Sequence, residues 1–210
     1  MDFLIYELTA EALHLGERAK GNILKPCLHT IPFSAITGAL SRVFGTSPEN
    51  GSAWGGIKAV GFLAEGVGRN RVETLTYSPR DRVAGISKIP LQVEFLADVL
   101  ATVLVVGDGE AVKLPNTFQI VLGGMRSHGF GTAELRFKER GAAGNPRPGL
   151  LRVRLPEEEA ETFGIVKVVM PIYGYLFRPA PGTHSGVYVR SLFEGSRVVA
   201  PELLLEPRQE

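Results

Sequence analysis

Apolar and polar residues alternate with a period of two along much of the chain, and this pattern predicts β-strands. Residues 2–9 have apolar side chains on both faces, with Leu4 and Tyr6 on one and Phe3 and Ile5 on the other. A strand that is apolar on both faces is typical of the interior of a sheet. We therefore expect this segment to be a central strand.

Further strands are predicted downstream. The β-branched run at 100–106 is typical of a buried strand. Residues 71–85 are expected to run as a strand into a turn at Ser78-Pro79, whereas 57–67 and 116–122 fit either a strand or a helix. The remaining expectations are strands at 132–138, 150–155 and 164–177, and a loop at 139–149.

One helix is predicted within residues 29–45, where apolar residues recur at helical spacing. Pro32 suits the first turn, Ser34 can cap it, and Gly45 is a suitable stop. Gly38 costs helix propensity, which indicates close approach of another backbone. Strands separated by few helices favour an α+β fold with a mainly antiparallel sheet.

The composition is that of an ordinary globular protein, with 210 residues of which 44% are hydrophobic and 21% charged. A single cysteine, Cys27, excludes an internal disulfide and a CxxC metal site. The first residues lack a basic start and a cleavage site, so they do not read as a signal peptide. No apolar run is long enough to span a membrane, and we expect a cytoplasmic protein without a membrane partner.

The net charge of +1 does not by itself suggest a nucleic-acid ligand, but the cations are unevenly distributed. Arginines outnumber lysines by 16 to 7, and an arginine can hold a phosphate with two nitrogens or stack on a base. Such a protein can still present a basic stripe, although arginines scattered over a solvated surface are the alternative. The cations of the richest segment are Arg69, Arg71, Arg80, Arg82 and Lys88.

The most distinctive segment is GGMRSHGFG at residues 123–131, where glycine fills four of nine positions. Glycine lets a backbone approach another group closely, so exposed amides with Arg126, Ser127 and His128 could face a phosphate. No Gly-Lys-Ser/Thr follows and a strand is expected next, which excludes a Walker loop and a dinucleotide fingerprint. A glycine-rich hairpin without a ligand is the alternative.

GGMRSHGFGTAEL resembles the glycine-rich loop of the CRISPR-associated RAMP superfamily, RNA-binding proteins with ferredoxin-like, RRM-related folds. IPFSAITGALSRVF upstream is similar to the first helix of that family, with its Pro-x-Ser-x-x-x-Gly-x-Leu pattern. EFLADVLATVLVV resembles a segment of the subgroup that caps the 5′ handle of crRNA. The three patches stand in the family's order, whereas residues 171–201 fit no motif of it.

The resemblance implies a ferredoxin-like domain at 1–138 with a thumb-like insertion at about 45–88, and a C-terminal β-rich lobe at 150–210. It implies a non-catalytic subunit of a CRISPR effector complex, which recognises the crRNA 5′ handle and contacts the backbone filament and the large subunit. No cofactor or metal is expected. The RNA-binding residues expected on these grounds are Ser34, Arg42, Trp54, Arg69, Arg71, Arg80, Arg82, Lys88, Gly123, Gly124, Arg126, Ser127, His128, Gly129, Phe130 and Gly131.

An endoribonuclease is the main alternative, because some relatives cleave repeat RNA with a histidine near the first helix. His29 stands at that place, and Lys25 or Arg42 could stabilise the transition state. No two histidines have the spacing of metal ligands, so a metal site is not expected. A repeating crRNA-backbone subunit and a globular protein unrelated to CRISPR are the other two alternatives.

Two further features concern the surface. Trp54, Tyr173, Tyr175 and Tyr188 could stack on bases, although core packing is the usual role of aromatic residues. The acidic run LPEEEAETF at 155–163 is expected to be a solvated surface turn. If it has a function, it repels RNA or docks on a basic neighbour.

Overall fold

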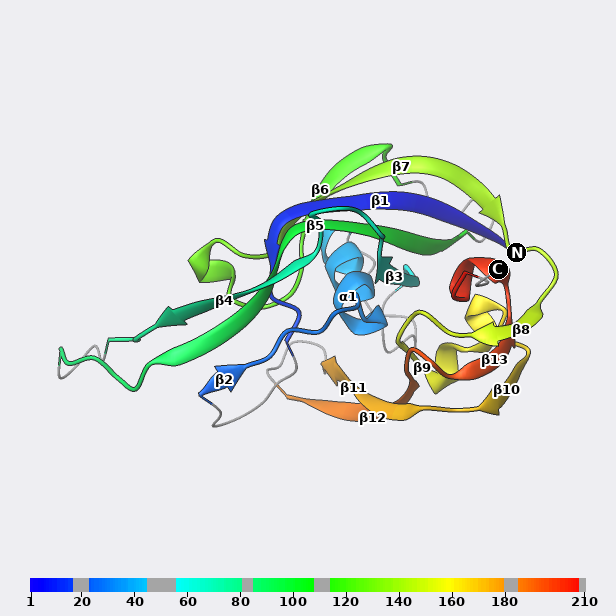
Figure 1. The fold of residues 1–210 in the computed structure, drawn as a ribbon. Coiled ribbons are helices and arrows are strands. Elements are labelled where there is room, and N and C mark those ends of the chain that lie inside the picture. The colour runs from blue at the N-terminus through cyan, green and yellow to red at the C-terminus, as the bar shows by residue number, and fades with distance from the viewer. Residues whose placement is uncertain (17–22, 45–55, 81–84, 108–113, 180–184, 208–210) are drawn as a thin grey trace.

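The computed structural model describes residues 1–16, 23–44, 56–80, 85–107, 114–179 and 185–207. In these residues the protein is mostly β, with one α-helix and one mixed sheet that dominates the fold (Figure 1). Its strands are β1 (Asp2–Leu13), β2 (Leu24–Lys25), β3 (Ala59–Leu63), β4 (Arg71–Tyr77), β5 (Leu91–Gly107), β6 (Thr117–Val121) and β7 (Thr132–Ala142).

The large sheet is built around β1 and β5. Its order is β2-β5-β1-β7-β6, with β3 and β4 also paired to β5, and every pair except β2 with β5 is antiparallel. The expectation that residues 2–9 form a central strand is confirmed, because β1 pairs with β5 on one side and β7 on the other. The ambiguous segments 57–67 and 116–122 contain the strands β3 and β6.

A kink in β5 sets the direction of the β4–β5 hairpin, which projects from the body of the molecule (Figure 1). Asp98 and Asn70 both adopt the left-handed backbone conformation, with φ of 51° and 54°. The Asn70 side chain takes the place of a missing strand rung: Nδ2 donates to Leu100 O at 3.0 Å, and Oδ1 accepts from Leu100 N at 2.9 Å. Arg71 closes the kink by pairing with Asp98 at 2.6 Å.

The helix α1 (Phe33–Val43) confirms the predicted helix but corrects two of its details. Pro32, not Ser34, is the N-cap residue, and no side chain caps the first turn. Gly38 was expected to admit a neighbouring backbone, yet a Cβ atom built there meets nothing within 4 Å. Gly38 therefore faces open space, and Gly45, the expected stop, lies outside the described residues.

The C-terminal segment forms two three-stranded sheets, in the orders β10-β13-β8 and β11-β12-β9, together with short 3₁₀ helices. The strands are β8 (Arg147–Leu150), β9 (Leu155–Pro156), β10 (Lys167–Met170), β11 (Tyr173–Pro179), β12 (Gly186–Leu192) and β13 (Arg197–Ala200). The 3₁₀ helices here are η3 (Glu157–Glu159), η4 (Glu161–Phe163) and η5 (Glu202–Leu204).

Three predictions in this segment are wrong. The loop expected at 139–149 is largely strand, because β7 extends to Ala142 and β8 begins at Arg147. The strand expected at 150–155 does not form, since β8 ends at Leu150 and β9 begins only at Leu155. The single strand expected at 164–177 is divided into β10 and β11 at Pro171, which has no amide hydrogen to continue a ladder.

Two groups of buried residues hold the layers together. Ile36 and Leu40 of α1 pack with Leu4 and Tyr6 of β1 in the first group. The second group joins the sheet to the C-terminal segment, and Phe163 is at its centre, with its ring 6.3 Å from Phe3 and 6.0 Å from Phe33. As a result α1 lies between the large sheet and the β11–β12 hairpin (Figure 1).

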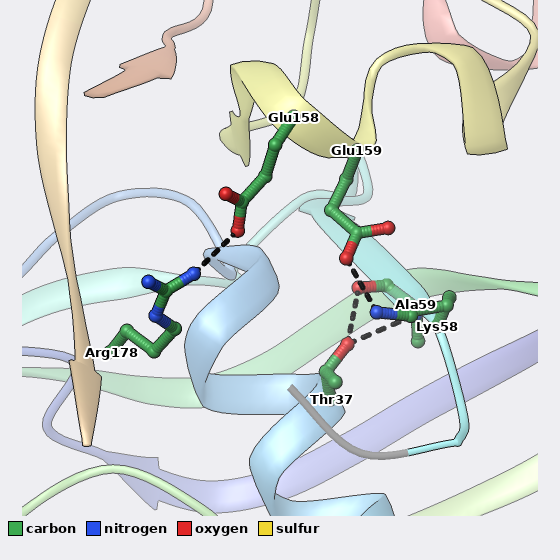
Figure 2. A network of polar contacts seen from close by, with 6 residues as sticks. All are labelled: Thr37, Lys58, Ala59, Glu158, Glu159 and Arg178. Carbon is green, nitrogen blue, oxygen red and sulfur yellow. Dashed lines mark hydrogen bonds and ion pairs between the residues drawn. The ribbon is translucent and has the colours of Figure 1, made fainter. Parts of the chain in front are cut away.

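The acidic run is not the solvated turn that the sequence suggested. Glu159 is buried at 8% exposure and pairs with Lys58, and Glu158 accepts a hydrogen bond from Arg178 at 2.8 Å (Figure 2). Beside them, the Thr37 hydroxyl donates to the Ala59 carbonyl at 3.2 Å and accepts from the Ala59 amide at 3.0 Å (Figure 2). The run therefore anchors η3 to neighbouring elements.

Candidate nucleic-acid interface

One groove of about 420 Å³ brings together three segments that are far apart in the sequence. They are α1 with the residue before it, the glycine-rich turn, and the β11–β12 hairpin, and Leu15, Gly16 and Leu28 complete the lining. The lining residues that bear on function are Pro32, Ser34, Gly38, Arg42, Gly123, Gly124, Arg126, Tyr175, Phe177 and Tyr188. Because Gly38 has no side chain, it leaves room in the groove beside α1.

Two arginines meet on the wall of this groove. Arg42 is in the last turn of α1, and Arg126 is the first residue of η2 (Arg126–His128). The pKa of Arg126 is lowered, mainly by partial burial and to a smaller extent by the nearby positive charge of Arg42. Arg126 Nε donates to the Gly123 carbonyl at 3.1 Å, and neither arginine forms an ion pair with an acid in the described part of the chain. This arrangement favours an anionic ligand, which would relieve the repulsion between two cations.

The glycines of the turn are required by how closely it packs on the end of β1. Gly123 has a φ of 79°, and a Cβ atom there would lie 2.5 Å from the His14 carbonyl oxygen. Gly131 has a φ of 100°, and its Cβ would lie 2.5 Å from the Leu122 carbonyl oxygen. Other residues would be strained at both positions, so these glycines fix where Arg126 is held.

Four backbone amides of the turn are used inside the protein and do not take part in the anion cradle that the glycine pattern suggested. The Gly124 amide donates to His14 O at 2.9 Å, and the Gly131 amide donates to Ala12 O at 3.0 Å. Those of His128 and Gly129 close the η2 turn on the carbonyls of Met125 and Arg126, at 2.9 and 3.2 Å. These four amides are thus already satisfied, and a cradle made by the other amides of the turn stays a prediction.

Three other residues of the turn point toward the β4–β5 hairpin. The ring of His128 lies 4.8 Å from that of Tyr77, and the Ser127 hydroxyl is 3.1 Å from His128 Nδ1. Phe130 packs edge-on against Phe95 at 4.9 Å and is only 8% exposed. The expectation that Phe130 contacts RNA is therefore corrected: it is a packing residue between the turn and β5.

The basic segment at 69–88 lies away from the groove, along and beside the β4–β5 hairpin. Arg69, Arg71 and Arg80 are exposed, as is Lys88, but Arg71 is neutralised by Asp98. None of these four lines the groove. Trp54 and Arg82, which were also expected to contact RNA, lie outside the described residues.

His29 lines a different cavity, of about 610 Å³, on which Arg152 also lies. The Arg152 guanidinium is centred 3.4 Å above the Phe62 ring and donates to Leu203 O at 2.8 Å. Burial lowers the pKa of Arg152 to about 10. Arg42, which was considered as a catalytic partner of His29, lies on the first groove instead. The structure does not bring that pair together.

The sequence left two roles open for the aromatic residues of β11 and β12, base stacking and core packing. Tyr175 and Tyr188 line the groove and are 62% and 58% exposed, whereas Tyr173 is beside η3, its hydroxyl donating to Glu157 at 2.8 Å. Sequence reasoning missed Phe177, which also lines the groove. Its spacing of two from Tyr175 is the strand period that could have identified it.

Two kinds of feature are not found in the described residues. They contain no cluster of three or more histidine, cysteine, aspartate or glutamate residues with the geometry of a metal site. No helix among them has the length and apolarity required to cross a membrane.

No protein-family description matches the sequence, and no curated protein matches it. Solved structures do. A chain of the type III-B Cmr-β complex bound to cognate target RNA superposes with a TM-score of 0.58 at 12% identity, covering 95% of this chain and 86% of that chain. A chain of the same complex bound to target RNA and AMPPnP superposes with a TM-score of 0.56 at 13% identity, with the same coverage of both chains. A chain of a CRISPR RNA-guided surveillance complex superposes with a TM-score of 0.50 at 15% identity, covering 99% of this chain and 95% of that chain.

The chain has the fold of CRISPR effector subunits. The resemblance carried by the glycine-rich turn and the first helix is therefore confirmed for the fold. Both motifs also meet in space, since residues of each line the same groove. The handle-capping subgroup stays a prediction.

Proposed function

We propose that this chain is a non-catalytic, cytoplasmic RNA-binding subunit of a CRISPR effector complex. Its role would be to recognise the 5′ handle of crRNA and to contact the backbone filament and the large subunit. The observation that carries the proposal is the pair Arg42 and Arg126, which share a groove wall without an acidic partner in the described residues.

Phosphate is the ligand that best fits this pair. A guanidinium can bind a phosphate with two nitrogens, and the two arginines would share one group or hold adjacent ones. A near-neutral protein can act in this way where some of its cations are neutralised locally and others are not. Arg154 pairs with Glu194 and Arg178 with Glu158, whereas Arg42 and Arg126 keep their charges available on the groove.

The topology agrees with a ferredoxin-like origin of the large sheet. Such a unit runs β-α-β-β-α-β, and here β1 and α1 are followed by β3 and β4, then by β5, and finally by β7 beside β1. Between β5 and β7 the described residues contain β6 and η2 where a second helix would be expected. We infer that this RRM-related unit has its second helix replaced by β6 and the glycine-rich turn.

Binding can be measured with the full chain and fluorescently labelled RNA. Repeat RNA carrying the 5′ handle should bind more tightly than an RNA of the same length with the handle scrambled. The affinity for both should fall steeply as salt rises, because phosphate contacts release counterions. Equal and salt-independent affinities, or no binding at low salt, would contradict the proposal. Native mass spectrometry should find one copy in each complex, whereas several copies would indicate a repeating backbone subunit.

Catalysis is tested separately. We expect repeat RNA to stay intact when it is incubated with the chain in EDTA. Cleavage that disappears in His29→Ala would show a metal-independent endoribonuclease and overturn the non-catalytic part of the proposal. The location of His29 on the second cavity, away from Arg42 and Arg126, is the reason we favour binding alone.

A further inference from the structure

The β11–β12 hairpin presents a row of aromatic rings on one face. Tyr175 lies directly opposite Arg190, and Phe177 lies opposite Tyr188. Side chains two residues apart on a strand share a face, so Tyr173 belongs to the same row. Tyr173, Tyr175 and Tyr188 are 44%, 62% and 58% exposed, so a large area of these rings faces solvent.

The two ends of this row are fixed by neighbours. At one end the Arg190 guanidinium lies 4.7 Å from the centre of the Tyr173 ring, and Glu157 accepts hydrogen bonds from both side chains. At the other end the rings of Phe177 and Tyr188 meet edge-on at 5.5 Å. Tyr175 lies between these ends. A rigid aromatic surface loses little conformational freedom when a planar ligand stacks on it.

The exposed rings are continuous with the two unpaired arginines. Tyr175, Phe177 and Tyr188 of the hairpin line the same groove as Arg42 of α1 and Arg126 of η2. A single strand whose phosphates lie at the arginines could therefore place its bases on the hairpin. Positive charge beside exposed rings is the combination that binds single-stranded nucleic acid.

We propose that Tyr175 and Tyr188 stack on unpaired bases of the RNA whose backbone is held by Arg42 and Arg126. This inference rests on the proposed function and adds the part of the RNA that the hairpin contacts. The ligand is a single-stranded segment with splayed bases, and stacking is tolerant of base identity because every base has a π-face. A paired region would not fit, because its bases are stacked on one another.

The test uses the full chain and a labelled RNA of ten uridines, with binding followed by fluorescence anisotropy. Tyr175→Ala and Tyr188→Ala should each weaken binding about tenfold, while Tyr175→Phe, which keeps the ring, should bind like the unchanged chain. Val187→Ala is the matched control, since Val187 is on the same hairpin and is 53% exposed. Circular dichroism checks that each variant folds.

A second probe separates stacking from backbone contact. An oligomer of the same length made of abasic sugars keeps its phosphates and lacks the bases. Tyr175→Ala should not change its affinity, whereas Arg42→Ala should weaken the binding of both oligomers. If the unchanged chain binds oligouridine and folded Tyr175→Ala and Tyr188→Ala bind it equally well, stacking is wrong and the proposed function stands. If the unchanged chain binds neither oligomer, the proposed function fails as well.

Discussion

The arginines in two regions of this molecule differ in whether they pair with acids. In the C-terminal segment several of them pair with acids, among them Arg154 with Glu194 and Arg178 with Glu158. On the groove wall Arg42 and Arg126 lie near each other and form no ion pair within the described residues. Paired cations help to hold the fold, and the two neighbouring arginines repel each other. The proposed function therefore rests on how individual cations are paired and not on the net charge.

The largest expected effect comes from the paired region. Glu159→Gln removes the ion pair with Lys58 at a site where the two side chains are 16% and 10% exposed, and should cost about 3 kcal/mol of unfolding free energy. Urea denaturation measures this cost. Glu139→Gln makes the same charge change at an exposed position of β7 and should be nearly neutral. The RNA affinities of the two folded variants should be equal. A loss of RNA binding in Glu159→Gln alone would contradict the division between residues that hold the fold and residues that bind RNA.

The groove arginines should show the opposite behaviour. Arg126→Ala and Arg42→Ala should each weaken RNA binding by about 1–3 kcal/mol and reduce the salt slope by about one. Their unfolding free energies should change by less than about 0.5 kcal/mol, because no ion pair is lost. Arg197→Ala, an exposed arginine of β13, is the control for net charge. Unchanged affinity in folded Arg126→Ala would remove Arg126 from the RNA site.

Gly38→Ala should have a smaller effect, and it should change the stability of the fold and the affinity for RNA in opposite directions. Alanine is a better helix former and its Cβ meets nothing within 4 Å, so Gly38→Ala should raise the unfolding free energy by up to about 1 kcal/mol. The same methyl group narrows the groove and should weaken RNA binding. Thermal unfolding and anisotropy test both parts. Tighter binding in the stabilised variant would show that RNA does not lie beside α1.

The smallest effect is a pH dependence. Burial alone would raise the pKa of Glu194, but hydrogen bonds from Arg154 and the charge of Arg154 outweigh it and lower that pKa. A carboxyl with a lowered pKa stabilises the fold above its unfolded pKa, and the stabilisation is lost as the pH falls through the folded pKa. Urea midpoints between about pH 6 and pH 3 should therefore fall less in Glu194→Gln. Parallel curves for the two proteins would contradict this assignment.

Local patterns were enough to predict α1 and parts of β1 and β5, because α1 and β1 have a consistent period and residues 100–106 of β5 are a β-branched run. The segments 57–67 and 116–122 stayed ambiguous because they are short, and pairing with β5 and β7 decides them. The glycine-rich turn could be recognised, but its neighbour could not be identified. Glycine spacing reveals that a backbone comes close to something, but not that the neighbour is the end of β1.

The acidic run shows the same limit. Glu157, Glu158 and Glu159 are consecutive, and local sequence marks them as solvated. Their partners Arg190, Arg178 and Lys58 are 33, 20 and 101 residues away, so only the fold reveals them. For the site, the family motifs marked Arg126 and Ser34 as RNA-binding residues, and Tyr175 and Tyr188 were candidates for base stacking. That these residues line one groove could not be predicted, because residues 171–201 match no motif.

The kink at Asp98 lies at the base of the β4–β5 hairpin and sets the angle at which the hairpin projects from the large sheet. β4 has 7 residues, so at about 3.3 Å per residue the arm is roughly 23 Å long. A turn of about 10° at Asp98 would therefore move its far end by about 4 Å, more than the reach of a hydrogen bond. Asp98→Gly would relieve the left-handed backbone and remove the ion pair between Arg71 and Asp98, leaving Arg71 only its pair with Glu73, so one substitution would loosen the angle of the hairpin.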